Sequence, residues 1–196
     1  MTREATPADF SPARFIKGII GSDELTEDAH RKHIAFVGRS NVGKSSLMNA
    51  LLGRNNLVKS SARPGKTTEI NYFEVGEHYY FVDLPGYGFA RLGAKQREKL
   101  RKLIVWYLLR SEIAKRAVCM VLDAGVGMTD FDREVLALIE EAEIPVCIVV
   151  NKIDRLNQSE RAKCRQEMET MGLSYFMLSA RTGRGLGSLQ EWLVSI

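Results

Sequence analysis

The sequence predicts an α/β domain with a mainly parallel sheet of six strands, one antiparallel edge strand and helices on both faces. Short apolar runs rich in Val, Ile, Leu and Cys alternate along the 196 residues with longer segments of helical spacing. The later runs are almost continuously apolar, which is typical of parallel strands covered by helices on both sides. The connection 76–78 is long enough only for a hairpin, so one strand runs antiparallel.

The individual elements follow in chain order from this pattern. We expect strands at 33–37, 70–75, 79–83, 117–123, 144–150 and 174–178, and helices at 43–52, 95–109, 130–142, 159–170 and 186–194. Asp130 and Ser159 are the predicted N-caps, because their side chains accept hydrogen bonds from free N–H groups at a helix start. Residues 1–30 form a predicted N-terminal extension of unassigned structure, and 31–196 a single folded domain without repeat or linker.

The composition is that of an ordinary globular protein, with 45% hydrophobic and 27% charged residues and a net charge of +4. No apolar run approaches the roughly 20 residues that span a bilayer, and the polar N-terminus does not resemble a secretory signal. Cys119, Cys147 and Cys164 form no CxxC pair, so neither a zinc site nor a disulfide framework is supported. These features predict a cytoplasmic protein without a membrane partner.

A glycine-rich loop at 38–45 (GRSNVGKS) matches the pattern GxxxxGK[ST] and lies between a predicted strand and a predicted helix. In such a P-loop the backbone N–H groups converge on phosphates, Lys44 reaches the β- and γ-phosphates, and the Ser45 hydroxyl is placed for Mg²⁺. The predicted phosphate contacts are Gly38, Arg39, Ser40, Asn41, Val42, Gly43, Lys44, Ser45 and Ser46. The loop alone does not distinguish ATP from GTP.

The tetrapeptide NKID at 151–154 follows a predicted parallel strand and indicates the base. The Asp154 carboxylate can accept hydrogen bonds from guanine N1–H and the 2-amino group, neither of which adenine offers, so discrimination is roughly 10⁴-fold or more. We expect Asn151 to bond the other edge of the ring, the Lys152 stem to lie over its face, and the Ser179 and Ala180 N–H groups to complete the pocket. The predicted base-binding residues are Asn151, Lys152, Ile153, Asp154, Leu178, Ser179 and Ala180. GTP and GDP are therefore the predicted ligands.

Two further segments have the form of nucleotide-sensing switches. Asp83 is predicted to hold Mg²⁺ through water, and the Gly86 N–H to sense the γ-phosphate. Thr67, in a polar segment between loop and strand, is the predicted second hydroxyl ligand of Mg²⁺, with Thr68 as the alternative. The predicted contacts in these segments are Gly65, Lys66, Thr67, Thr68, Asp83, Leu84, Pro85 and Gly86. Lys44, Thr67 and Gly86 are the predicted catalytic groups.

Together these motifs resemble those of the EngB/YsxC ribosome-biogenesis GTP-binding proteins, within the TrmE–Era–EngA–EngB–septin class. The matching pieces are GRSNVGKSS (38–46), RPGKT (63–67), DLPGYG (83–88), NKID (151–154) and SA (179–180). The resemblance covers nearly the whole chain and implies one GTPase domain that hydrolyses GTP to GDP and phosphate as a switch in large ribosomal subunit assembly. Thr68 stands where the family commonly has Gln, and LSA replaces its frequent FSS. The alternative function is a nucleotide-gated regulatory module for a protein partner, with incidental hydrolysis.

Two positions leave the hydrolysis mechanism open. Tyr87 occupies the site at which many GTPases carry a glutamine that orients the attacking water, which predicts slow intrinsic hydrolysis stimulated by a partner. The alternative is that Tyr87 is a packed aromatic beside the switch. Asn41 matches an asparagine that binds K⁺ in several relatives; its alternative role is a loop residue bonded to its own backbone.

A basic stretch at 91–116 carries nine basic and two acidic residues, a local net charge of +7. Because it begins just after the DLPGYG segment, we expect it to contact the large-subunit particle or its rRNA. The alternative is an ordinary solvated helix face. No DNA partner is expected, and the predicted state is a monomer.

Overall fold

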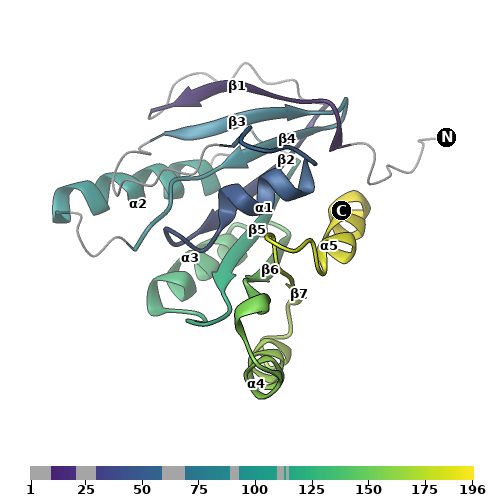
Figure 1. The fold of residues 1–196 in the computed structure, drawn as a ribbon. Coiled ribbons are helices and arrows are strands. Elements are labelled where there is room, and N and C mark those ends of the chain that lie inside the picture. Colours follow the sequence, from purple (N-terminus) through teal and green to yellow (C-terminus); the bar gives the residue numbers. More distant parts are fainter. Residues whose placement is uncertain (1–9, 21–29, 59–68, 89–92, 110–112, 114) are drawn as a thin grey trace.

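The computed structural model describes residues 10–20, 30–58, 69–88, 93–109, 113 and 115–196. In this part of the chain one sheet contains seven strands in the order β1-β3-β4-β2-β5-β6-β7 (Figure 1). The strands are β1 Ala13–Ile19, β2 Lys32–Gly38, β3 Ile70–Val75, β4 Tyr79–Asp83, β5 Arg116–Asp123, β6 Val146–Asn151 and β7 Ser174–Met177. The helices are α1 Lys44–Leu51, α2 Ala94–Leu108, α3 Asp130–Glu141, α4 Gln158–Glu169 and α5 Leu186–Ser195, with a single 3₁₀ turn, η2, at Ile153–Arg155.

The mainly parallel α/β sheet is confirmed. Strand β2 pairs in parallel with β4 and β5, and β5–β6 and β6–β7 are also parallel. Strand β3 runs antiparallel to β4 across the short 76–78 connection, as the hairpin argument requires. It is not an edge strand, however, because β1 pairs antiparallel along its other side.

Strand β1 corrects the prediction of six strands and comes from the N-terminal segment that the sequence left unassigned. Ala13 and Ile19 at its ends are buried, whereas Phe15 is 51% exposed and Ile16 is also exposed. The strand therefore lacks the apolar–polar alternation that would have revealed it. Its backbone hydrogen bonds to β3 and the edge-on contact of Phe15 with Phe73 hold it in place.

Helices cover both faces of the sheet, and successive residues of β2 show why. Ile34 and Phe36 pack in the cluster that contains residues of α1 and α5, whereas Ala35 and Val37 pack in the cluster that contains residues of α2, α3 and α4. All four side chains are completely buried. Because neighbouring side chains point to opposite faces, a strand that is buried on both sides must be continuously apolar.

The predicted helix caps at Asp130 and Ser159 are wrong. Helix α3 is capped by Thr129, whose side chain accepts the Asp132 N–H while the Asp132 carboxylate accepts the Thr129 N–H at 2.8 Å. Helix α4 is capped in the same reciprocal way by Asn157. Thr129 and Asn157 are favoured as caps because each is followed three residues later by an acid, Asp132 or Glu160. In such a capping box each of the two side chains accepts a hydrogen bond from the backbone N–H of the other residue.

The cysteine thiols are all free and buried, and Cys119 Sγ lies 3.7 Å from Cys147 Sγ on the neighbouring strand. Burial raises the pKa of the Cys147 thiol, so this sulfur stays protonated and packs as a small hydrophobic group. No helix in the described ranges has both the length and the apolar character needed to cross a bilayer.

Candidate nucleotide-binding site

The predicted motifs meet at one edge of the sheet. Parallel strands β2, β4, β5 and β6 end there, at Gly38, Asp83, Asp123 and Asn151 respectively. In open α/β sheets the crevice beyond the carboxyl ends of the strands is the usual place for a ligand. The fold therefore collects segments that are up to about a hundred residues apart in the chain into one site.

The phosphate loop 38–45 connects β2 to α1 and is built tightly around its glycines. Gly43 precedes α1 with φ of 100°, and a Cβ atom there would lie 2.3 Å from Asn151 Nδ2. Only glycine fits this position, both for its conformation and for the close approach. The N-cap residue Gly43 has no side chain, and among the described residues no side-chain cap hydrogen bond is made to the first N–H groups of α1. The positive end of the helix is therefore available to an anion such as a phosphate.

Lys44 and Asp83 face each other at the phosphate end of the site. Lys44 Nζ lies 3.8 Å from Asp83 Oδ1, which is too long for a hydrogen bond. Burial raises the pKa of the Asp83 carboxyl, and the neighbouring Lys44 charge opposes that shift. Asp83 Oδ1 is buried without a hydrogen-bond partner among the described residues. A buried, unpartnered carboxylate oxygen beside the helix turn that carries Ser45 suits Mg²⁺ and its water ligands.

The DLPGYG segment 83–88 lies directly against the phosphate loop. The Ser40 N–H donates to the Tyr87 carbonyl at 2.8 Å. A Cβ atom on Gly86 would lie 3.0 Å from Ser40 Oγ, so the glycine allows this close contact. The predicted γ-phosphate sensor Gly86 thus sits beside the loop that holds the phosphates. Of the remaining predicted groups, Gly65, Lys66, Thr67 and Thr68 lie outside the described residues.

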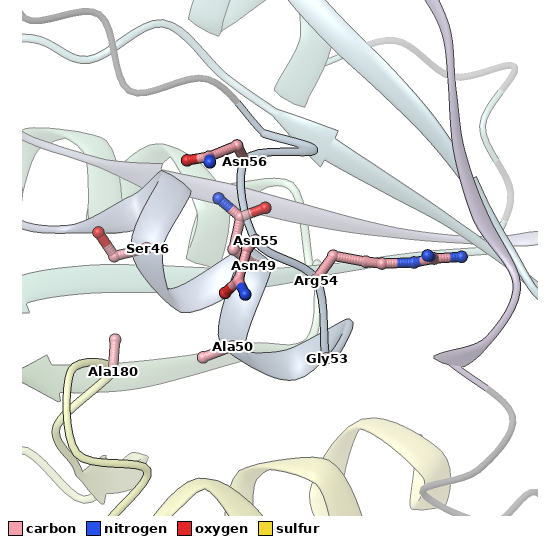
Figure 2. A pocket seen from close by; sticks show the side chains of 8 residues that line it. All are labelled: Ser46, Asn49, Ala50, Gly53, Arg54, Asn55, Asn56 and Ala180. Carbon is pink, nitrogen blue, oxygen red and sulfur yellow. The ribbon is translucent and has the colours of Figure 1, made fainter.

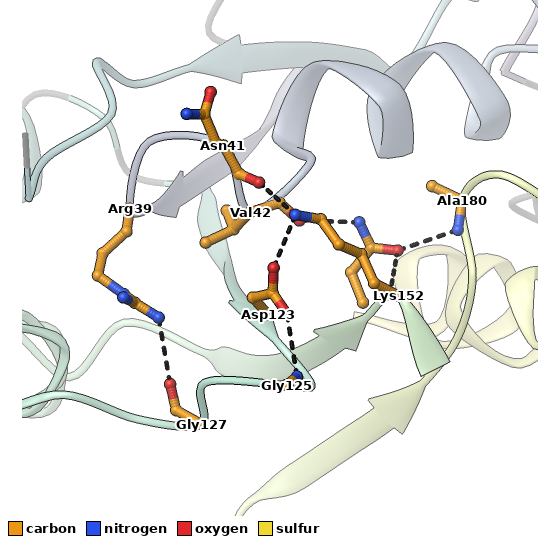
Figure 3. Close-up of polar contacts among 9 residues, drawn as sticks. Arg39, Asn41, Val42, Asp123, Gly125, Gly127, Lys152 and Ala180 are labelled. Carbon is orange, nitrogen blue, oxygen red and sulfur yellow. Dashed lines mark hydrogen bonds and ion pairs between the residues drawn. The ribbon is translucent and has the colours of Figure 1, made fainter. Parts of the chain in front are cut away.

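Asn151 makes hydrogen bonds to three backbone groups within the protein. Its Nδ2 donates to the Val42 carbonyl at 3.0 Å, and its Oδ1 accepts the Lys152 and Ala180 N–H groups at 2.8 and 3.0 Å (Figure 3). The residue is only 2% exposed. Through these bonds Asn151 ties the phosphate loop to the loops predicted to bind the base, and one N–H of its amide is left for the predicted bond to the edge of the ring.

The backbone donors expected to contact the base are also engaged within the protein. The Ala180 N–H is bonded to Asn151, and the Ser179 N–H donates to the Arg184 carbonyl at 2.9 Å. The Ser179 hydroxyl donates to Asp154 Oδ1 at 2.6 Å. This hydrogen bond lowers the pKa of Asp154, so the carboxylate that is predicted to accept hydrogen bonds from guanine is ionised at neutral pH.

Asp123 is a site residue that the sequence analysis missed. Lys152 Nζ lies 2.7 Å from Asp123 Oδ2 and also donates to the Asn41 carbonyl, as Figure 3 shows. Burial alone would raise the pKa of Asp123, but the hydrogen bonds from Lys152 and the Gly125 N–H outweigh it and lower the pKa. The ionised Asp123 therefore orients the Lys152 stem. One feature of the sequence could have indicated Asp123. It ends β5, the strand that lies between β2, which leads into the phosphate loop, and β6, which leads into NKID.

A cavity of about 630 Å³ lies beside the site and adds polar residues that no motif marks (Figure 2). It is lined by Ser46, Asn49, Ala50, Gly53, Arg54, Asn55, Asn56 and Ala180. Ser46 and Ala180 are predicted nucleotide contacts, so the cavity is continuous with the predicted site. Its volume is within the range of small-molecule pockets. Asn49 shapes one wall, because its side-chain amide makes two hydrogen bonds to the Val58 backbone, at 2.8 and 2.9 Å.

Tyr87 is a packed aromatic residue in this structure. It is 3% exposed, and its ring lies 4.7 Å from that of Phe131 on α3. Its hydroxyl donates to Asp132 and is thereby turned toward α3. The geometry agrees with the packed-aromatic alternative, and it leaves position 87 without a side chain that could orient water at the phosphates.

A P-loop beside an Asp-x-x-Gly turn and an Asn-Lys-x-Asp base site defines the chain as a GTPase. The family model described as 50S ribosome-binding GTPase matches residues 33–152, and that of the elongation factor Tu GTP-binding domain matches 110–196. GTPases of this kind generally use Mg²⁺, which agrees with the donors Ser45 and Asp83.

Within the GTPases, the chain belongs to the EngB family. It is 43% identical over 167 residues to the probable GTP-binding protein EngB of Chlorobaculum parvum, an alignment that covers 83% of this chain and 86% of the relative. Identity to the protein of the same name from Oleidesulfovibrio alaskensis is 42% over 185 residues, or 93% and 84% of the two chains. A crystal structure of a probable GTP-binding protein engB superposes with a TM-score of 0.68 at 27% identity, covering 83% and 97%.

Proposed function

We propose that this GTPase acts as a nucleotide-controlled switch in large ribosomal subunit assembly, in the cytoplasm and as a monomer. The observation that carries the proposal is the set of exposed basic side chains on α2, the helix that follows the DLPGYG segment. Its exposed basic side chains are Lys95, Arg97, Lys99, Arg101 and Lys102, of which Lys102 lies 3.8 Å from Glu98. Arg91 and Arg110, also in the basic stretch 91–116, lie outside the described residues.

The switch rests on the loss of one phosphate. Water attacks the γ-phosphorus, the bond to the β-phosphate oxygen breaks, and GDP and inorganic phosphate are the products. Lys44 offsets the negative charge on the transferring group, while Thr67 and Gly86 are the groups that the γ-phosphate orders. After hydrolysis their ligand is gone, and the segment that leads into α2 is released.

The comparisons support an RNA-containing partner. The matched family is described as ribosome-binding GTPases of the 50S particle. A second GTPase with a TM-score of 0.66 and 25% identity, Era, has a crystal structure with MgGDPNP and nucleotides 1506–1542 of 16S ribosomal RNA. A basic helix adjoining a switch would make binding to such a polyanion depend on the nucleotide state.

The α2 surface is tested by removing two of its charges. Lys95→Ala combined with Lys99→Ala should weaken binding to large ribosomal subunits in the GTP-analogue state several-fold and reduce the slope of log affinity against log salt by roughly 1.5. The matched control, Lys163→Ala with Arg165→Ala, removes two exposed charges from α4. Affinity that is independent of salt, or equal losses in both double variants, would contradict the proposal.

Stimulated turnover separates the proposal from its alternative. If large subunits accelerate GTP hydrolysis, catalysis belongs to the function. Tight binding without acceleration would favour the regulatory module, in which hydrolysis is incidental.

We also propose that K⁺ assists hydrolysis through Asn41, which resembles the K⁺-binding asparagine of several relatives. Asn41 is exposed at the phosphate loop in a left-handed conformation, with φ of 66°. A cation bound there would add positive charge where the transition state is negative. Turnover should be at least about tenfold faster in K⁺ than in Na⁺ at equal ionic strength, and Asn41→Ala should remove the difference. Equal rates in the two salts would disprove this role.

A further inference from the structure

A buried carboxylate on α3, Asp132, joins the phosphate loop to the DLPGYG segment although it belongs to no nucleotide-binding motif. Asp132 is completely buried. The Tyr87 hydroxyl donates to its Oδ1 at 2.7 Å, and Arg39 Nε lies 3.2 Å from its Oδ2. Oδ2 also accepts the N–H and the hydroxyl of Thr129, at 2.8 and 2.6 Å. One side chain thus holds residues from three separate segments.

The two segments that Asp132 joins are also paired through their backbones. Arg39 and Tyr87 form a parallel β-bridge, and the next residue, Ser40, donates its N–H to the Tyr87 carbonyl. Arg39 is further held by a hydrogen bond from its Nη2 to the Gly127 carbonyl at 3.4 Å (Figure 3). Backbone and side-chain contacts together hold Arg39 and Tyr87 in place. Arg39 directly precedes Ser40, and Tyr87 directly follows Gly86.

The protonation states suit a permanent clamp. Burial raises the pKa of the Tyr87 hydroxyl far above its ordinary value, and the Asp132 charge raises it further. The phenol therefore donates to the carboxylate throughout the physiological range. A buried carboxylate is costly unless it is paired and fully hydrogen-bonded. Asp132 meets that condition through one cation and three hydrogen-bond donors.

We propose that Asp132 is a positioning residue for GTP hydrolysis, acting through Tyr87 and Arg39. It fixes Ser40 and Gly86, the groups that face each other where the γ-phosphate is expected. The inference rests on the GTPase activity and is independent of any ribosomal role. Since GDP has no γ-phosphate, loosening the clamp should impair GTP binding and hydrolysis much more than GDP binding.

Tyr87→Phe is the most selective test, because it removes one hydroxyl and leaves the Thr129–Asp132 capping box intact. We expect the single-turnover rate of GTP hydrolysis and the ratio of GTP to GDP affinity each to fall by about tenfold, with GDP affinity unchanged within about twofold. The matched control is Tyr175→Phe, whose hydroxyl contacts Glu169 on α4 at 3.2 Å and none of the predicted nucleotide contacts; it should behave as the native protein. Native rates and affinity ratios in Tyr87→Phe, or parallel losses of GTP and GDP affinity, would overturn the proposal.

A double-variant cycle shows whether Tyr87 acts through Asp132. Asp132→Asn removes the charge that pairs with Arg39, and the combination with Tyr87→Phe should lower the single-turnover rate no further than the more damaging single variant. Additive losses would mean that Tyr87 affects hydrolysis independently of Asp132, which contradicts the inferred route.

Discussion

Asp154→Asn is expected to lower GTP affinity about 10³-fold or more and to create affinity for xanthosine triphosphate. The native carboxylate is predicted to accept hydrogen bonds from two guanine donors, whereas the asparagine amide accepts from one of them and places an N–H opposite the other, which is left unpaired. Xanthine carries a carbonyl where guanine has its 2-amino group, so the same amide N–H can donate to it. Competition binding with GTP, xanthosine triphosphate and ATP measures all three affinities.

The neighbouring cation provides the control for this substitution. Arg181 Nη1 lies 3.9 Å from Asp154 Oδ2, but its side chain is 84% exposed. A solvent-exposed pair of this kind contributes little, so Arg181→Ala should change GTP affinity no more than about threefold. If Asp154→Asn also changed GTP affinity by only a few-fold, Asp154 would not be the residue that selects guanine.

Asn151→Ala is expected to impair both folding stability and nucleotide binding. The substitution leaves the Val42 carbonyl and two N–H groups without the side chain that satisfies them. At about 1–3 kcal/mol for each of the three buried unpaired groups, the free energy of unfolding should fall by roughly 3–9 kcal/mol. For a chain of this size that lowers Tm by about 6–36 °C, which thermal unfolding measures. GTP and GDP affinity should fall together, because the phosphate and base loops lose their common tie.

Asn157→Ala is the matched control for that variant. Asn157 caps α4 and lies outside the site, so its loss should cost about 1 kcal/mol and leave GTP affinity unchanged. If Asn151→Ala destabilised the protein no more than Asn157→Ala and still bound GTP normally, the tie would not have the structural role assigned to it.

Local signals in the sequence were sufficient for most of the fold. Strands β3 and β4 have the predicted bounds, and the hairpin between them was deduced from loop length alone. Strand β1 was missed because Phe15 and Ile16 are both apolar and exposed, and the register of the edge strand shifts between Phe15 and Lys17, which leaves no period to detect. The cap of α3 was missed because its choice depends on Asp132, three residues further along the chain.

The sequence predicts those residues of the candidate site that belong to nucleotide-binding motifs. It does not predict the residues that contact only other protein groups. Lys44, Asp83 and Gly86 belong to short motifs whose spacing reflects the shape of a nucleotide, and they meet at one edge of the sheet. Asp123 and Asp132 instead pair with Lys152 and Arg39, at separations of 29 and 93 residues. Such partners are set by the three-dimensional fold, so no spacing in the chain reveals them.

Sedimentation with purified large ribosomal subunits tests the central claim, that the bound nucleotide controls association with the particle. The protein is incubated with a non-hydrolysable GTP analogue, with GDP or without nucleotide, and the fraction that sediments with the subunits is measured in each state. We expect co-sedimentation with the GTP analogue and release in the other two states. Co-sedimentation in no state, or to the same extent in all three, would contradict the account.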